Sequence, residues 1–505
     1  MNEKIQIAFG LLGGLAIFIY GMNMMSECLQ KAAGEKMRSI LALLTKNPVM
    51  GVLAGALTTA VLQSSSATTV MAIGFVSAGF MNLPQAISII IGANIGTTMT
   101  AQIIAFKLSD YIYAIIFAGF IISFLVKSEK VKNIGQTIFA FGLLFLGIET
   151  MGGVMKPLAD SPVFTEMIAR VSDVPILGVA VGTLMTLVVQ SSSATVAVLQ
   201  NFASQAGPDG VTSVIGLAGA IPILFGDNIG TTITAVLASI GQTKDAKRTA
   251  VAHCVFNISG TFLFIWFVGP FAQFIQMISP KGPEIEVISR QIANAHTVFN
   301  CVMTLIWVPL IWLMVKIVMR IIPDGRKEQY SLSEPLYLDE KLIGQPTAAL
   351  QLVAKEVLHC SEIVRDMIRQ TREALKNEEK KEIEDVHCKL DAVKSLHARI
   401  TQYLTDLFAS GSLNEEQASQ SAGIMYVLSD VDRMGILCGE VAGGIKEKME
   451  KKYKYSKEAM KDLGKSLELI ETMYSEVLEA IVSGKLEHAK ELVKKREKIM
   501  ELDIS

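Results

Sequence analysis

The stretch GVLAGALTTAVLQSSSAT, residues 51–68, occurs a second time in this 505-residue chain as GVAVGTLMTLVVQSSSAT, residues 178–195. The two stretches are identical at 12 of 18 positions. Each is followed by NIGTTxT, at residues 94–100 and 228–234. Three consecutive serines inside apolar sequence are unfavourable in a hydrophobic core, because each buried hydroxyl needs a hydrogen-bond partner. The duplication therefore predicts two halves of one polar binding site.

Long apolar runs fill residues 1–322, whereas residues 323–505 are rich in charge and poor in glycine. A bilayer-spanning helix needs about 20 apolar residues. A duplicated polar interruption in such a chain is typical of a secondary transporter. FGLLGGLAIF at Phe9 is echoed by FGLLFLGIE at Phe141, so we expect the N-terminal segment to belong to the fold and not to a signal peptide. The predicted spans are 5–27, 85–106, 111–127, 134–155, 212–240, 249–272 and 293–320.

The serine-bearing segments do not fit a spanning helix. The apolar arms of the first copy, 51–62 and 69–80, have only about 12 residues each, too few to cross a bilayer. We predict a re-entrant hairpin with QSSSAT at its tip, tolerated because the tip lines a polar cavity, and a second hairpin over about 176–204. Three crossings in the first repeat invert the second repeat relative to the first. The two tips are then predicted to meet near the membrane midplane.

The placement of positive charge predicts the orientation. With the N-terminus outside, the predicted inner loops carry ten lysines and arginines and the outer loops six. The chain is thus predicted to be an all-α, multi-pass protein of a bacterial cytoplasmic membrane, an inverted-repeat transporter with two re-entrant hairpins and a cytoplasmic helical bundle. Its predicted parts are repeat 1 (1–133), repeat 2 with extra C-terminal helices (134–322), a proline-bearing linker (323–346) and the bundle (347–505).

The tips offer hydroxyls and amides but no charge. A hydroxyl both donates and accepts, so one cluster can surround an oxyanion and also present oxygens to a sodium ion. The second arm of each hairpin starts a helix whose N–H groups favour an anion. An alternative is that small polar residues only let helices pack closely. The candidate phosphate-binding residues are Gln63, Ser64, Ser65, Ser66, Thr68, Ser191, Ser192, Ser193 and Thr195.

The NIGTT segments place polar side chains beside glycines, where a helix can unwind and free its carbonyls for a cation. Asp227 precedes the second NIGTT, where the first copy has Ala93. A carboxylate at membrane depth indicates a functional site, which either binds a cation or responds to protons. Equally, it could lie in a wet vestibule and cap the following helix. The candidate sodium-binding residues are Gln190, Ser191, Asn94, Thr97, Thr98, Asn228, Thr231, Thr232 and Asp227.

QSSSAT paired with NIGTT in two halves resembles the type II sodium–phosphate cotransporter family, over most of residues 1–320. The resemblance implies that the tips bind phosphate and that Gln190, Ser191, Thr231 and Thr232 contribute to a sodium site. It extends to AVAHCVFNISG at Ala250, part of which recurs as AHTVFN at Ala295. We interpret the polar residues of these segments as helix-packing contacts and not as ligands: His253, Asn257, His296 and Asn300.

The bacterial branch of that family often carries a PhoU-like domain, and the C-terminal region resembles one. Helical spacing predicts helices over 347–377, 380–409, 415–449, 456–483 and 485–503, one fewer than the usual six. SDVDRMGILCGEVA at Ser429 is similar to a PhoU motif, but Ile436 stands where that motif has an aspartate. Only Asp430 and Asp432 remain locally, so no metal is expected in the bundle.

The net charge of −2 says nothing about binding partners, but no basic cluster suggests nucleic acid, and no nucleic-acid partner is expected. No nucleophile–base pair or metal-ligand spacing indicates an enzyme, and no cofactor is expected. The leading hypothesis is a sodium-coupled phosphate importer in a lipid bilayer, with sodium as coupling ion. The alternatives are a phosphate exporter and a membrane-tethered phosphate-signalling regulator. The bundle is expected to bind a regulatory protein or to self-associate.

Overall fold

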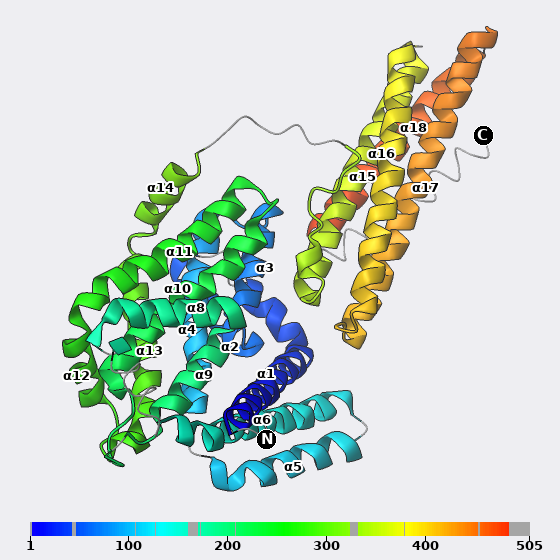
Figure 1. Cartoon of the computed structure of the whole chain (residues 1–505). Helices are drawn as coiled ribbons and strands as arrows, with labels where there is room; N and C mark the ends of the chain where they lie inside the picture. The colour runs from blue at the N-terminus through cyan, green and yellow to red at the C-terminus, as the bar shows by residue number, and fades with distance from the viewer. Residues whose placement is uncertain are drawn as a thin grey trace. The chain divides into compact units, whose positions relative to one another are not determined.

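The computed structural model describes residues 3–42, 47–106, 108–126, 128–159, 170–171, 173–207, 209–323, 332–377, 379–452 and 455–483. The described residues form helices, turns and loops and contain no β-strand. An isolated β-bridge pairs Ala206 with Ser213. The all-α prediction is therefore confirmed. The chain divides into two compact units, Met1–Gly325 and Arg326–Ser505, and Figure 1 labels the helices of each.

The first unit contains two copies of one three-helix arrangement. We call α2, α3 and α4 the first triplet and α8, α9 and α10 the second triplet. In each, a short helix, a tight turn and a second short helix pack on one long helix. The bounds are α2 Pro48–Leu62, α3 Ser65–Ser77, α4 Leu83–Ile104, α8 Pro175–Val189, α9 Ser192–Ala203 and α10 Gly216–Ser239.

Glycines bring the backbones of each triplet into direct contact. A Cβ atom built on Gly92 of α4 would lie 1.9 Å from the carbonyl oxygen of Val52 in α2, and one on Gly55 of α2 would lie 2.1 Å from that of Ile89. The second triplet repeats this contact, with 2.0 Å from Gly226 to Val179 O and 2.0 Å from Gly182 to Ile223 O. Without a hydrophobic drive between helices in lipid, such close packing supplies the attraction.

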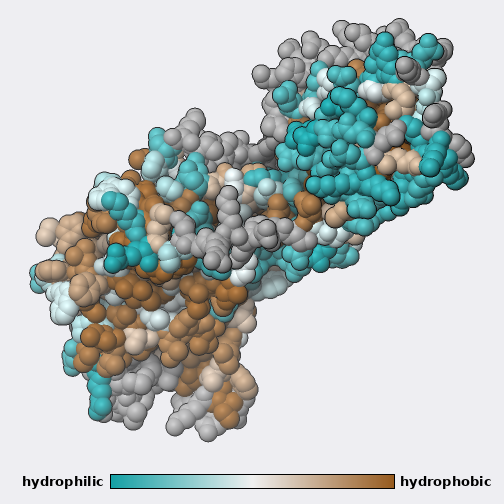
Figure 2. All heavy atoms as spheres, turned by 90° about the horizontal axis from the view of Figure 1, so that it is seen from above, coloured by the Kyte–Doolittle hydropathy of each residue, from teal (hydrophilic) through white to brown (hydrophobic). Residues whose placement is uncertain are grey.

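The remaining helices of the first unit surround the triplets. α1 (Glu3–Ala42) packs along α6 (Glu129–Ala159), and α5 (Ile112–Leu125) packs on α6. α11 (Lys244–Phe264), α12 (Val268–Ile278), α13 (Glu284–Trp307) and α14 (Ile311–Ile321) follow the second triplet. Figure 2 shows that the visible face of this unit is largely hydrophobic, whereas that of the second unit is largely hydrophilic.

Two of the seven predicted spans have a different shape. The segment predicted at 293–320 is two helices, α13 and α14, which are bent by 86° at their break. Pro309 lies in that break, and proline removes a backbone donor and clashes with the preceding turn. The segment predicted at 111–127 forms α5, which has only 14 residues. Among the described residues, five helices are long and apolar enough to cross a membrane, or six if the bent pair counts as one.

The second unit is an antiparallel helical bundle of α15 (Pro346–Asn377), α16 (Lys380–Ala409), α17 (Glu415–Lys451) and α18 (Lys457–Ser483). The first four predicted helices therefore match the structure closely. The fifth, 485–503, lies outside the described residues. A continuous apolar core runs along α15, α16 and α17, including Val353, Met367, Leu396 and Leu404.

Part of the predicted linker belongs to the second unit. Leu342 is fully buried, and Leu338 and Ile343 pack against the core of the bundle. The fully buried carboxylate of Glu356 in α15 accepts a 2.6 Å hydrogen bond from the backbone N–H of Tyr337. Burial raises the pKa of this carboxyl. Residues 324–331 of the predicted linker lie outside the described residues.

We predict that alanine at Gly92 or Gly226 destabilises the protein, because the added Cβ would force two helix backbones apart. Overpacking of this kind costs about 1–3 kcal/mol. Thermal unfolding in detergent measures the effect. Gly13→Ala in α1 is the matched control, since a Cβ there meets nothing within 4 Å. Equal melting temperatures for all three variants and the wild type would contradict the packing interpretation.

Candidate functional site

Each QSSS segment forms a tight turn between the two short helices of its triplet. The glutamine adopts a left-handed conformation, with φ of 52° at Gln63 and 53° at Gln190. The next residue, Ser64 or Ser191, caps the following helix: its side chain accepts a hydrogen bond from the N–H of Ala67 or Ala194. These turns have the same geometry to within a degree at the glutamine, so the duplicated sequence folds the same way twice.

The capping serines, Ser64 and Ser191, can still donate a hydrogen bond to a ligand. A hydroxyl that accepts from a backbone N–H still has its own proton to donate. The helices that start at Ser65 and Ser192 also direct their N-termini to the turns, where the helix dipole favours an anion. Ser65 and Ser192 are 4 % and 8 % exposed. The turns therefore combine hydroxyl donors with the positive ends of two helices and no carboxylate of their own.

The last residue of each QSSSAT segment is hydrogen-bonded within its triplet. Thr59 of α2 donates to the Thr68 hydroxyl at 2.8 Å, and Thr186 of α8 lies 3.1 Å from the Thr195 hydroxyl. All four side chains are buried. Thr59 and Thr186 were not predicted as site residues. Their signal was present, because both occupy the same position within the duplicated stretch.

Polar contacts also join one triplet to the other. Thr234 of α10 lies 3.1 Å from the hydroxyl of Ser66 in the first turn. Gln200 of α9 donates to the carbonyl oxygen of Ala101 in α4 at 3.1 Å. Within the first triplet, Thr100 of α4 donates to the side chain of Gln63 at 3.0 Å. The threonine that ends each NIGTTxT segment therefore contacts the first QSSS turn.

The expectation that the NIGTT segments unwind is wrong. α4 and α10 are continuous helices through both segments. Threonine hydroxyls bond back along the helix, from Thr97 to Ala93 O at 3.0 Å and from Thr231 to Asp227 O at 2.8 Å. The glycines serve the close contacts with α2 and α8 instead: a Cβ on Gly96 would lie 2.6 Å from Ala56 O. Thr98 and Thr232 bond to Ile95 O and Ile229 O in the same way.

Asp227 is fully buried inside α10, neither exposed to a vestibule nor at the start of a helix. This rules out the interpretation of its side chain as a solvated helix cap. Its Oδ1 accepts a 2.7 Å hydrogen bond from Thr186, and its Oδ2 has no hydrogen-bond partner.

The duplicated AHxVFN helices hold the NIGTT asparagines. His253 Nε2 lies 3.1 Å from Asn94 Oδ1, and His296 Nε2 lies 3.2 Å from Asn228 Oδ1. All four side chains are buried. Each histidine thus contacts one of the candidate sodium-binding residues. They fix which way each asparagine amide points.

The histidine–asparagine clusters of the two copies differ in one respect. In the first, Asn94 Nδ2 donates to Asn257 Oδ1 at 3.4 Å. In the second, the corresponding Asn228 Nδ2 and Asn300 Oδ1 both lack a partner although they are buried. Together with Asp227 Oδ2, the second copy thus has three unsatisfied polar atoms that the first copy lacks at the equivalent positions.

Residues 17–153 and 155–304 match the Na+/Pi-cotransporter family. The chain belongs to that family. Residues 357–444 match the PhoU domain. The resemblance drawn from QSSSAT and NIGTT is confirmed, and the family is one of phosphate transporters and not of enzymes, as expected. No solved structure matches the chain.

Individual relatives extend this result. The uncharacterised protein YqeW of Bacillus subtilis is 32% identical over 319 residues, covering 63% of this chain and 99% of YqeW. YjbB of Salmonella typhimurium, named as a candidate inorganic phosphate export protein, is 25% identical over 455 residues, 90% of this chain and 81% of YjbB. Sodium-dependent phosphate transport protein 2A of Rattus norvegicus is 30% identical over 190 residues, 34% of this chain and 29% of that protein.

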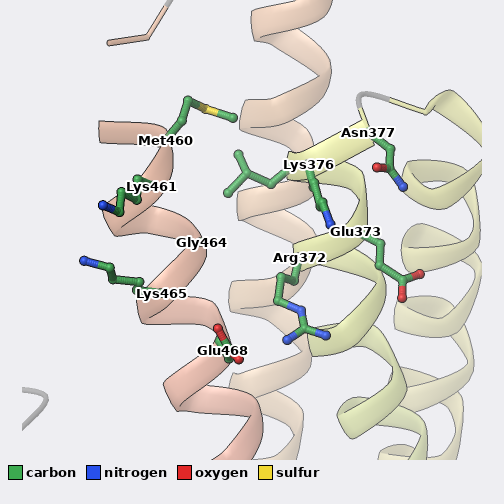
Figure 3. A pocket seen from close by; sticks show the side chains of 10 residues that line it. Arg372, Glu373, Lys376, Asn377, Met460, Lys461, Gly464, Lys465 and Glu468 are labelled. Carbon is green, nitrogen blue, oxygen red and sulfur yellow. The ribbon is translucent and has the colours of Figure 1, made fainter. Parts of the chain in front are cut away.

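The second unit contains a cleft, but its lining residues do not identify a ligand. A cleft of about 800 Å³ lies between the end of α15 and the start of α18. Figure 3 shows that Lys461 and Lys465 point away from α15. Arg372 is paired with Glu471 at 3.2 Å, so the cleft is mixed in charge and indicates no particular ligand. No group of three His, Cys, Asp or Glu side chains that could hold a metal occurs in the described part of the bundle.

We predict that Gln63→Gly and Gln190→Gly preserve the fold, because glycine adopts positive φ readily. Gln63→Val and Gln190→Val should instead destabilise the protein, since a β-branched residue at φ > 0 is strained by about 1–3 kcal/mol. Thermal unfolding of the four variants measures the difference. The left-handed turn would be refuted if valine were tolerated as well as glycine at both positions.

Proposed function

We propose that this protein is a sodium-coupled secondary transporter that imports inorganic phosphate across the bacterial cytoplasmic membrane. The observation that carries the proposal is the pair of matching QSSS turns, each at the N-terminus of a short helix. Phosphate is an acceptor of hydrogen bonds on every oxygen, and the turns supply hydroxyl, amide and backbone donors. The proposed phosphate-binding residues are those predicted from the sequence, Gln63 to Ser66 and Thr68 in the first turn and Ser191 to Ser193 and Thr195 in the second.

The proposed membrane arrangement is an inverted repeat with two re-entrant hairpins. Each hairpin arm has 12 to 15 residues, which at 1.5 Å per residue is about 18–23 Å and shorter than the roughly 30 Å hydrocarbon core. We propose that the two repeats meet near residue 133, as predicted from the sequence.

Sodium coupling is supported by energetics and by the oxygen-rich surroundings of the second turn. Moving one charge across 100 mV is worth about 2.3 kcal/mol, so divalent phosphate entering a negative interior would cost about 4.6 kcal/mol. Two sodium ions cancel this charge and a third makes entry electrically favourable. The proposed sodium-binding residues are Gln190 and Ser191, the NIGTT residues Asn94, Thr97, Thr98, Asn228, Thr231 and Thr232, and Asp227.

Export is the second candidate function. YjbB, which is aligned with 90% of this chain, is named as a candidate phosphate exporter. Sodium-dependent phosphate transport protein 2A is aligned with only 34% of this chain. The same turns would serve either direction. We propose that the PhoU domain lies in the cytoplasm and regulates transport by docking a partner protein or a second copy.

The proposal predicts sodium-driven phosphate uptake. Purified protein in proteoliposomes should accumulate radiolabelled phosphate faster under an inward sodium gradient than under an equal potassium gradient, because only sodium fills the coupling sites. Protein-free liposomes are the control. Efflux from phosphate-loaded vesicles together with no sodium-stimulated uptake would support export. If the protein showed no phosphate flux in either direction and no phosphate binding, transport by these turns would be refuted.

Serine-to-alanine changes test the turns directly. Ser65→Ala or Ser192→Ala should weaken phosphate binding by about 1–3 kcal/mol, roughly 5- to 150-fold, because a ligand oxygen loses its donor in a buried site. Titration of purified protein with phosphate measures the affinity. Ser123→Ala in α5 is the matched control, since that hydroxyl donates to Phe120 O in its own helix. If both variants bind phosphate with wild-type affinity, Ser65 and Ser192 are not phosphate-binding residues.

A further inference from the structure

Asp227 is the main chemical difference between the two triplets. The equivalent position in the first triplet is Ala93, and the helices around both positions otherwise match. Asp227 is fully buried. An ionised carboxylate without a counter-charge in an apolar environment is strongly unfavourable, so it must either bind a proton or hold a cation.

Hydroxyls connect this carboxyl to the second QSSS turn. Thr186 donates to Asp227 Oδ1 at 2.7 Å and lies 3.1 Å from the hydroxyl of Thr195, the last residue of QSSSAT. The first triplet has the same threonine pair, Thr59 and Thr68, without the carboxyl. Asp227 Oδ2 is buried and has no hydrogen-bond partner, so one acceptor oxygen remains for a ligand.

The helices packed on α10 offer no counter-charge that reaches Asp227. α3, α8, α9 and α12 contain no charged residue. On α11, Arg248 pairs with Asp245 and bonds to Ile322 O. On α13, Arg290 bonds to Gln102. The other titratable groups on these two helices are Lys244, Lys247, His253, Cys254, Glu284, Glu286, His296 and Cys301, of which the histidines bond to Asn94 and Asn228 through Nε2.

We propose that Asp227, Thr186 and Thr195 form a sodium site in the second triplet alone. Sodium prefers oxygen ligands, and carboxylate and hydroxyl oxygens are both present here. Because Thr195 belongs to the second turn, filling the site stabilises that turn and promotes phosphate binding there. This inference deepens the proposed function: it makes the two halves of the phosphate site unequal, with coupling concentrated in the second.

The test uses the full-length protein in detergent and two readouts that need no transport. The first is the stoichiometry and affinity of ²²Na⁺ binding. The second is proton release or uptake on adding phosphate, followed with a pH indicator in weak buffer and compared with a phosphate-free addition. The variants are Asp227→Asn, Asp227→Ala, which reproduces the Ala93 arrangement, and Thr186→Val. Glu149→Gln, an exposed carboxyl on α6, is the matched control.

Asp227→Asn should lose one bound ²²Na⁺ or weaken it at least about tenfold, as expected for removal of a charged ligand. Intact sodium binding together with loss of the phosphate-linked proton signal would mean that Asp227 carries a proton, and would overturn the sodium assignment. Thr186→Val should act in the same direction with a smaller effect. Both Asp227 variants are expected to fold, because removing an unpaired buried carboxyl relieves a desolvation cost.

Wild-type sodium binding in Asp227→Asn and Asp227→Ala would overturn the proposal, as would a large drop in melting temperature in both, which would make the carboxyl structural. Wild-type protein that binds sodium but not phosphate would refute the proposed function and leave the cation site standing. If the wild-type protein transports phosphate and the Asp227 variants bind sodium as the wild type does, the cation site is refuted and the proposed function stands.

Discussion

The structure depends on backbone contacts between helices that only glycine allows. At Gly92 and Gly226 a side chain would lie within 2.0 Å of a carbonyl oxygen of the neighbouring short helix. These contacts fix α2 on α4 and α8 on α10, and thereby place each QSSS turn beside a NIGTT segment. The contact of α8 with α10 also brings Thr186 within hydrogen-bond distance of Asp227. The polar site is a consequence of close helix packing in sequence that has almost no charge.

Duplication supplies both halves of the proposed site, and divergence gives the two halves different properties. The turns and the threonine pairs are repeated, as are the contacts between histidine and asparagine. The second copy adds Asp227 and leaves Asn228 Nδ2 and Asn300 Oδ1 unsatisfied. A symmetric site would bind its ligand equally from both halves. The concentration of unsatisfied atoms in one half is consistent with a ligand that only that half binds.

Much of this arrangement was predictable, because the repeat itself carried the information. The hairpin arms, the turns and four helices of the bundle followed from apolar length, from QSSSAT and from helical spacing. Other features depend on contacts between residues distant in the chain. The NIGTT segments were expected to unwind because glycine often permits it, but Gly92 and Gly96 are used for packing. The partner of Asn94 lies more than 150 residues away at His253, and no spacing rule predicts such a pair. The GxxxG spacings at Gly51–Gly55 and Gly226–Gly230 were the overlooked signal.

The left-handed glutamines have a mechanical consequence. Each first arm is held by glycine contacts to the long helix of its own triplet, whereas each second arm also packs against the other triplet, α3 on α10 and α9 on α4. A displacement of one triplet against the other would therefore separate the two arms of both hairpins. Gln63 and Gln190 are the joints at which the backbone would have to absorb that movement. One hinge residue, Gln63, is proposed to bind phosphate and the other, Gln190, to bind sodium, so that ligand binding and arm movement would involve the same two residues.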